Sequence, residues 1–177
     1  MQKPIIYTIG HSILEIDKFI DLLNAHGVKA IADVRTIPKS RHNPQFNQEE
    51  LKQSLKEAKI AYRHIKKLGG LRHARKDSVN LGWKNTSFRG YADYMNTDDF
   101  ASGLEQLKTM ANKKVTAIMC AEAVPWRCHR SLIADALTKQ KWAVFHIQSR
   151  KTANRHKLTP FLKIRSGKIV YPFNSGG

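Results

Sequence analysis

The sequence predicts an α/β fold: a three-layer sandwich in which helices cover both faces of a mainly parallel five-stranded sheet. Short apolar, β-branched runs alternate with stretches of helical spacing along the whole chain. Regular alternation of this kind implies right-handed β-α-β crossovers and a parallel sheet. The chain has 177 residues, no internal repeat and no Pro-, Ser- or Gly-rich linker. We therefore expect a single domain over residues 1–177.

The first strand and the first helix are both marked at their ends. An apolar run over residues 4–9 ends at Gly10, which is typical of a buried strand. Apolar residues then recur at helical spacing over residues 16–23, and Gly27 stands where a helix C-terminal glycine belongs. A second strand-like run covers residues 29–34. These elements predict the first β-α-β unit.

The next stretch holds one helix, one strand and a long loop. Asn47 and Glu50 have the spacing of an N-cap and its glutamate partner, which predicts a helix over residues 47–58. Residues 60–65 are strand-like. Residues 66–86 show no clear period, and loops of that length are usually functional or mobile.

The remaining elements alternate in the same way. Helical spacing predicts helices over residues 88–95, 99–110 and 127–140, and apolar runs predict strands over residues 115–120 and 142–147. We assign the sheet the strand order 3-2-1-4-5, because this order sets the first and fourth strands side by side where the winding direction reverses. Open parallel sheets bind their ligands at that edge.

The positive charge is concentrated in two stretches of the chain. The formal net charge is +17, and no acidic residue follows Asp135. A basic C-terminal extension therefore begins at about residue 150, and a second basic cluster covers residues 63–76. Residues 168–173 of the extension either add an edge strand or pack on the surface. Such a field attracts polyanions, so nucleic acid or a nucleotide is a plausible partner. The alternative is that a high isoelectric point only keeps the protein in solution.

We expect a cytoplasmic protein that does not enter a membrane. No apolar run is long enough to span a bilayer, and the amino terminus lacks the apolar block and cleavage site of a signal peptide. The only cysteines are Cys120 and Cys128, which do not make a disulfide framework.

Polar residues stand where the predicted strands end. Parallel strands bring their carboxyl ends to one edge, so these residues are expected to converge on one pocket. Each also has a structural alternative: His11 can fix a turn, and Asp33 can cap one while Arg35 lies on the surface. The four motifs are His11-Ser12, Asp33-Val34-Arg35, His64 with the Gly69-Gly70 loop, and Cys120-Ala121-Glu122.

The segment over residues 119–130 is the densest in reactive groups. It runs from a strand into a helix N-terminus, where free N–H groups and the helix dipole favour a phosphate or a thiolate. Cys120 or Cys128 is therefore a candidate nucleophile, although either one can be a small apolar filler. A Glu122 carboxylate buried beside Arg130 would be a general base or half of a structural ion pair.

A donor-rich loop over residues 40–46 precedes the second helix. Its Ser40 and Arg41 would help to clamp an anionic substrate. Serine, asparagine and proline are also ordinary turn formers, so a simple capped connection is the alternative.

Two other kinds of site use similar residues. Cysteine phosphatases and rhodaneses share the succession of strand, cysteine, loop, arginine and helix. Here Cys120 and Arg127 are one residue further apart than in the phosphatases, and the loop holds a glutamate and a proline that would crowd an anion. Zinc bound by the two cysteines and His129 does not match the usual ligand spacing. We expect no metal and no cofactor.

Several motifs spread from end to end of the chain are familiar when taken together. They cover residues 7–12, 33–35, 38–46, 68–70, 88–92, 119–122 with 128–130, and 156–161. In combination they resemble the domain-of-unknown-function 488 family of bacterial proteins. The resemblance implies an α/β fold, paired cysteines and an intact family pocket, and it supplies no substrate.

We expect an enzyme that acts on a phosphate-containing substrate, a nucleotide or nucleic acid, at the strand-end pocket. Glu122 or Asp33 would be the acid or base, and Cys120 and Cys128 would supply or shape the nucleophile. A non-catalytic nucleic-acid-binding protein is the alternative, and a cysteine-dependent phosphatase or sulfurtransferase is the second alternative. The residues expected to bind substrate or phosphate are His11, Ser12, Arg35, Ser40, Arg41, His129 and Arg130.

Overall fold

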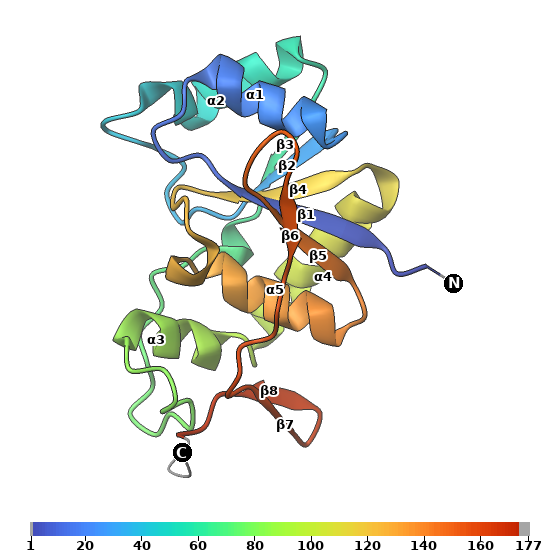
Figure 1. Cartoon of the computed structure of the whole chain (residues 1–177). Coiled ribbons are helices and arrows are strands. Elements are labelled where there is room, and N and C mark those ends of the chain that lie inside the picture. The colour runs from blue at the N-terminus through green and yellow to red at the C-terminus, as the bar shows by residue number, and fades with distance from the viewer. Residues whose placement is uncertain (1, 174–177) are drawn as a thin grey trace.

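The computed structural model describes residues 2–173 and contains a six-stranded sheet between two layers of helices (Figure 1). Its order is β3-β2-β4-β1-β5-β6, and only the edge strand β6 runs antiparallel. The predicted α/β class with a mainly parallel sheet is confirmed. The strands are β1 (Ile5–Gly10), β2 (Ala30–Asp33), β3 (Ala61–His64), β4 (Thr116–Cys120), β5 (Ala143–Ile147) and β6 (Ala153–Arg155).

The centre of the sheet differs from the predicted strand order. β1 and β4 are exchanged, so that β4 lies between β2 and β1, and β1 pairs with β4 and β5. An apolar run identifies a buried strand but not its neighbours, and both central strands carry such a run. The β1 and β4 strands are nevertheless adjacent, and their ends are level, because Gly10 pairs with Cys120. The β2 strand ends beside them, because Asp33 pairs with Met119.

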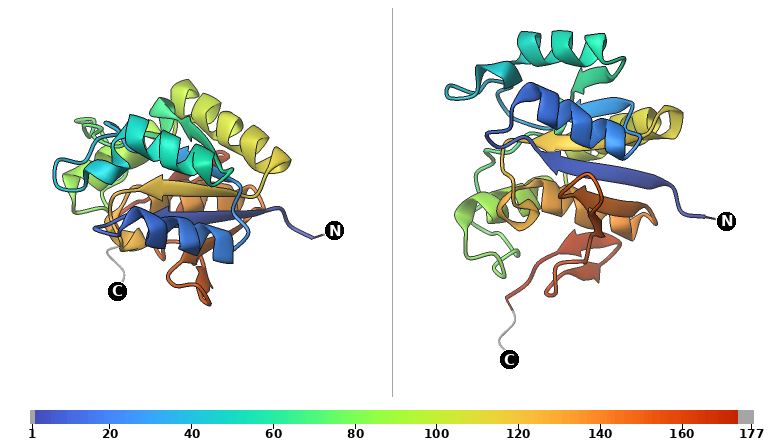
Figure 2. Two further views of the ribbon diagram at one scale, coloured as in Figure 1. Left: turned by 90° about the horizontal axis from the view of Figure 1, so that it is seen from above. Right: turned by 45° about the horizontal axis from the view of Figure 1, so that its top comes forward.

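Helices cover both faces of the sheet (Figures 1 and 2). One hydrophobic cluster lies under α1 (Ile16–Ala25) and α2 (Gln48–Glu57), and a second lies on the other face with α4 (Asp98–Lys113) and α5 (Arg130–Lys139). β4 alternates between them: Ala117 and Met119 join the first cluster, while Ile118 and Cys120 join the second. α3 (Thr86–Tyr94) packs beside α5 (Figure 1).

The connections hold one departure from the predicted capping. Asn47 does not cap α2 through its side chain, because its Oδ1 accepts a hydrogen bond from Ser40 N at 2.7 Å. The expected loop over residues 66–86 contains a single 3-10 turn, Lys66–Leu68, and is otherwise irregular. Two further 3-10 turns, Pro44–Phe46 and Pro125–Arg127, shorten the paths into α2 and α5.

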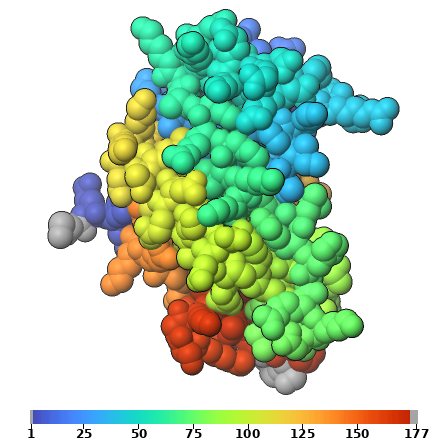
Figure 3. Space-filling model, turned by 180° about the vertical axis from the view of Figure 1, so that it is seen from behind, coloured from blue at the N-terminus to red at the C-terminus, as the bar shows by residue number. Residues whose placement is uncertain are grey.

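The C-terminal extension forms a small hairpin apart from the main sheet. β7 (Lys163–Arg165) pairs with β8 (Lys168–Val170), so the tail strand predicted near residue 168 does not lie at the edge of the main sheet. Seen from behind, the hairpin lies at the foot of the molecule, below α4 (Figure 3). None of the helices formed within residues 2–173 combines the length and the apolar character needed to cross a membrane.

Candidate functional site: a cysteine pair at the strand ends

The strand-end residues of β1 and β4 are joined by backbone hydrogen bonds. His11 N donates to Cys120 O at 2.9 Å, and Ser12 N donates to Ala121 O at 2.9 Å. These bonds extend the β1–β4 pairing past the last strand residue. Beside them opens a cavity of about 330 Å³. Its walls are Arg35, Gly70, Asn85, Ser87, Phe88, Tyr91, Cys120, Ala121, Glu122, Arg127, Cys128 and His129.

Two cysteine side chains meet at the base of this cavity. The Sγ atoms of Cys120 and Cys128 are 2.7 Å apart, and the Cys128 thiol donates to Cys120. Arg130 Nη1 donates to Cys120 Sγ at 2.7 Å, while Arg130 N lies 3.5 Å from Cys128 Sγ. The cysteines come from the end of β4 and from the turn before α5. The sequence thus brings together two thiols that lie eight residues apart.

The electrostatics divide the two cysteines into a thiolate and a thiol. Burial opposes ionisation of Cys120, but the hydrogen bond from Cys128 and the charge and hydrogen bond of Arg130 outweigh it, so the pKa of Cys120 falls to about 7. The pKa of Cys128 is raised well above its ordinary value, because its proton is held in the hydrogen bond to Cys120 and its sulfur is buried. Cys120 is therefore the more readily ionised cysteine of the pair.

The guanidinium of Arg130 fills the centre of the loop between the cysteines. Its Nη1 also donates to Glu122 O at 2.5 Å, and its Nη2 donates to Ala123 O at 3.1 Å. Gly10 makes room for this arrangement, since a methyl group there would overlap the Glu122 carbonyl oxygen. The loop therefore turns carbonyl groups toward a buried cation.

The expected placement of the Glu122 carboxylate beside Arg130 is wrong. The Glu122 side chain is exposed, and its Oε1 accepts a hydrogen bond from Val124 N at 3.3 Å. Arg130 contacts the main chain of this residue instead. The sequence identifies Glu122 and Arg130 as neighbours, but not that the contact is made by the Glu122 carbonyl oxygen. The loop after a strand end decides which way a side chain turns, and no sequence pattern shows that direction. Glu122 still lines the cavity, at its solvent side.

Asp33 orients Arg35 from below the cavity. The Asp33 carboxylate is fully buried and accepts from Arg35 Nε at 2.9 Å, from Arg35 Nη2 at 2.8 Å and from Tyr62 Oη at 2.5 Å. Arg35 is buried and lines the cavity, so the surface alternative for this arginine is wrong. Asp33 itself does not line it. Its oxygens are all engaged in holding Arg35, which is a positioning geometry.

His11 and His129 are both neutral side chains, because their pKa values are lowered. Burial, together with the charge of Arg35, lowers the pKa of His11, whose ring stacks on Phe46 with centroids 4.2 Å apart. Burial also lowers the pKa of His129 to about 4. His129 Nε2 donates to Val34 O at 2.9 Å, which leaves Nδ1 facing Cys128 Sγ at 3.7 Å. Only His129 lines the cavity.

Six residues expected at the pocket do not line it. Asp33, His11 and Arg130 lie behind residues that do, and the other three are Ser12, Ser40 and Arg41. Ser12 occupies a left-handed turn with φ 48° after β1. Ser40 Oγ accepts a hydrogen bond from Asn43 N at 3.2 Å, so it closes a local turn, and Arg41 is exposed. The alternative of an ordinary capped connection describes the loop over residues 40–46.

The segment before and within α3 supplies cavity residues that the sequence analysis missed. Asn85, Ser87, Phe88 and Tyr91 all line the cavity. Asn85 Oδ1 caps α3 by accepting from Ser87 N at 2.8 Å. The motif over residues 88–92 was one available signal. Among residues 2–173, no group of three or more His, Cys, Asp and Glu side chains is arranged to hold a metal ion.

Comparison with known proteins identifies the family. The sequence model of the family described as "Domain of unknown function DUF488" matches residues 15–137, which run from α1 into α5 and include both cysteines, Asp33, Arg35 and Arg130. Searches of curated proteins and of solved structures give no match. The matched segment covers more than half of the chain, and the protein therefore belongs to the DUF488 family.

Proposed function

We propose that this protein is an enzyme that acts on a phosphate-containing substrate at the cysteine cavity and reduces it through Cys120 and Cys128. The observation that carries the proposal is the contact between the two sulfur atoms, with the guanidinium of Arg130 bonded to Cys120 alone. Cys120, whose pKa is lowered, supplies the attacking thiolate. The adjacent thiol of Cys128, whose pKa is raised, keeps its proton until the second step.

The reaction proceeds in two steps that balance as a thiol–disulfide exchange. The Cys120 thiolate attacks one sulfur of a substrate disulfide, which forms a mixed disulfide and releases the other substrate half as a thiolate. Cys128 then loses its proton and attacks Cys120 Sγ, which releases the second half as a thiol. The substrate gains two electrons, and the two cysteines become a disulfide that an external dithiol must reduce.

Positive and neutral donors around the cavity support an anionic substrate. Arg35 and Arg127 line the cavity together with Asn85 and Ser87. Arg35 is held rigidly by Asp33 in a pair that is 4% and 0% exposed, so its position is prepared before a ligand arrives. The net charge of +17 favours the approach of phosphate groups.

A cysteine-dependent phosphatase has less support. Such an enzyme surrounds the anion with backbone N–H groups, whereas this loop turns the carbonyls of Glu122 and Ala123 inward, onto Arg130. A sulfurtransferase would share the attack of Cys120 on sulfur and differ in passing the sulfur on. We further propose a cytoplasmic location, since a reducing compartment returns the cysteine pair to its dithiol form.

The proposal is tested with the disulfide of phosphopantetheine as substrate and dithiothreitol as reductant. We expect turnover in the wild type, and a mixed disulfide on Cys120 that accumulates in Cys128→Ser, seen by intact-protein mass spectrometry. The disulfide of pantetheine, which lacks only the phosphates, is the matched substrate control and should react more slowly. Arg127→Met should reduce that difference.

Three outcomes would contradict the proposal. Turnover by Cys120→Ser as fast as by the wild type would rule out Cys120 as the nucleophile. An equal rate with the phosphate-free disulfide would rule out an anionic substrate. Hydrolysis of p-nitrophenyl phosphate without loss of free thiols would favour the phosphatase alternative instead.

A further inference from the structure

A second and larger cavity lies on the other side of the loop over residues 121–130. Its volume is about 750 Å³, within the range of small-molecule sites in proteins. The loop separates the two cavities, because Pro125 and Trp126 face this one while Arg127 and Cys128 line the first. The remaining walls are Trp83, Ser131, His146, Gln148, Asn154, Arg155, His156, Lys157, Leu158, Thr159, Pro160 and Phe161.

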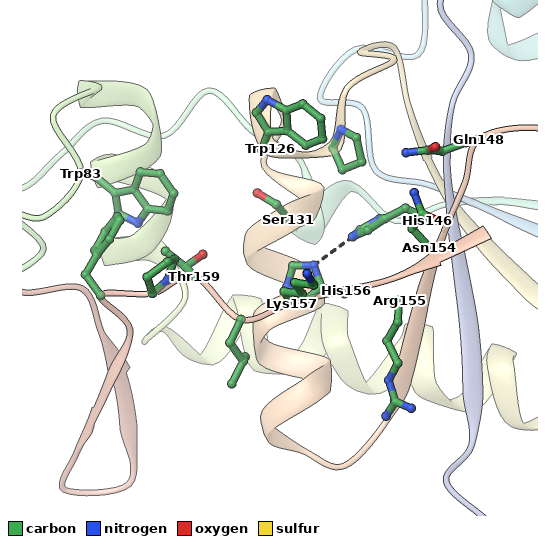
Figure 4. A pocket seen from close by; sticks show the side chains of 14 residues that line it. Trp83, Trp126, Ser131, His146, Gln148, Asn154, Arg155, His156, Lys157 and Thr159 are labelled. Carbon is green, nitrogen blue, oxygen red and sulfur yellow. Dashed lines mark hydrogen bonds between the residues drawn. The ribbon is translucent and has the colours of Figure 1, made fainter. Parts of the chain in front are cut away.

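A continuous chain of hydrogen bonds fixes the two histidines in the wall of this cavity. Thr8 Oγ1 lies 2.6 Å from His146 Nδ1, and His146 Nε2 lies 2.9 Å from His156 Nδ1 (Figure 4). His156 Nε2 is 2.7 Å from Asp135 Oδ1. Every ring nitrogen is therefore engaged, and burial lowers the pKa of His146 to about 3, so it stays neutral. These histidines are a fixed wall, without a nitrogen free to act on a ligand.

Aromatic side chains form the opposite wall. Trp83 packs against Phe161 with ring centroids 4.9 Å apart, and Trp126 is 67% exposed although it lines the cavity. In Figure 4, Trp83 and Trp126 lie on the side away from β6. Trp83 is half-buried, whereas the exposed indole of Trp126 offers a stacking surface for a planar ring. Stacking on bases is largely independent of sequence.

Cations and side-chain amides complete the rim. Arg155 and Lys157 are exposed, and neither pairs with a carboxylate within residues 2–173. The chain carries no acidic residue after Asp135, so the segment that holds them has no carboxylate side chain of its own. Gln148 and Asn154 contribute donors and acceptors of the kind that contact base edges. The stacking ring and the amides suit a base, and the unpaired cations suit the phosphates of a nucleotide in a strand.

We propose that this cavity binds one nucleotide of a single-stranded nucleic acid. The base stacks on the indole of Trp126, and the phosphates on either side contact Lys157, Arg155 and the basic C-terminal segment. A duplex does not fit, because its bases are stacked and paired and cannot enter the cavity without unpairing. The site is distinct from the cysteine cavity and does not depend on the thiol chemistry.

The proposal is tested by fluorescence anisotropy with a labelled short oligothymidylate, a duplex of equal length and free thymidine monophosphate. The strand should bind at least tenfold more tightly than either competitor. Trp126→Ala should weaken strand binding by roughly 5- to 150-fold, the range given by loss of one base-stacking contact. Trp126→Phe should restore most of the affinity.

Matched charge variants separate this site from general attraction. Lys157→Ala removes one phosphate contact, so it should lower the slope of log affinity against log salt by about 1. Lys113→Ala, at the end of α4, should leave the slope unchanged. Equal binding of strand and duplex, or unchanged binding by Trp126→Ala, would overturn the proposal. Equally tight binding of the free mononucleotide would also overturn it. Cys120→Ser should bind the strand normally, so failure of the thiol chemistry leaves this test intact.

Discussion

The two cavities on either side of the loop over residues 121–130 are built on opposite principles. In the cysteine cavity one buried cation, Arg130, faces a thiol pair and lowers the pKa of Cys120 to about 7. In the larger cavity, named the histidine cavity after His146 and His156 in its wall, the buried carboxylate of Asp135 is matched by donors from His156, Thr159 and Tyr171. An imbalance of partners creates a reactive atom, whereas a complete set of partners creates a rigid wall. The first arrangement suits chemistry and the second suits recognition.

The largest expected effect comes from removing Arg130, the cation that is bonded to Cys120. Arg130→Met should return the pKa of Cys120 toward its ordinary value near 9. The thiolate fraction at neutral pH would fall from about one half to about 1%, so alkylation by iodoacetamide should slow roughly 50-fold. Arg63→Met, the same change at an exposed side chain, is the control. An unchanged rate, in a variant with a wild-type circular dichroism spectrum, would contradict the asymmetry of the thiol pair.

The corresponding change in the histidine cavity should affect stability and leave the thiols alone. Asp135→Asn removes the charge-assisted bonds to His156, Thr159 and Tyr171, so the free energy of unfolding in urea should fall by roughly 2–4 kcal/mol. Asp21→Asn, which breaks the exposed pair with Arg150, should cost less than about 1 kcal/mol. Thiol alkylation should be unchanged in both variants. A loss of thiol reactivity in Asp135→Asn alone would show that the cavities are not separate.

The pH dependence of alkylation gives a finer measure of the thiol pair. Because the reactive form is the thiolate and the pKa of Cys120 is lowered to about 7, its rate should rise tenfold per pH unit below pH 7 and level off above it. Cys128, whose pKa is raised, should remain slow over the same range. Cys128→Ala should move the Cys120 midpoint upward, since a stabilising hydrogen bond is lost. A midpoint near 9 in the wild type would contradict this assignment.

The smallest effect is expected at the rim of the histidine cavity. Trp126 is 67% exposed, so Trp126→Ala should change the free energy of unfolding by less than about 0.5 kcal/mol. Trp142→Ala, at a tryptophan that is 6% exposed, should cost roughly 3–5 kcal/mol by the same urea measurement. A large loss in Trp126→Ala would mean that this indole is a structural side chain and not a free stacking surface.

The elements and the position of the cysteine cavity were predictable from the sequence. Apolar runs and helical spacing locate the five parallel strands, and the rule for open sheets places the cavity where β1 and β4 end. The order of these two strands was not predictable, because their patterns are alike. The expectation of one domain over residues 1–177 stays a prediction.

Side-chain direction and long-range partners account for what the sequence analysis missed. Glu122 follows a strand end, where the loop decides which way the carboxylate turns. The chain from Thr8 to Asp135 joins β1, β5, α5 and the segment after β6, and no local pattern links these positions. One signal was present: His146 interrupts an apolar strand, and a polar side chain at a buried strand position requires a partner.

Gly10 influences the cysteine cavity although it has no side chain. The space left by its missing methyl group lets the carbonyl of Glu122 approach β1, where it meets the arginine that polarises the sulfur of Cys120. An alanine at this position would push the loop outward and weaken that grip. The acidity of the thiol is thus tuned by the smallest residue in the chain, through the shape of the backbone alone.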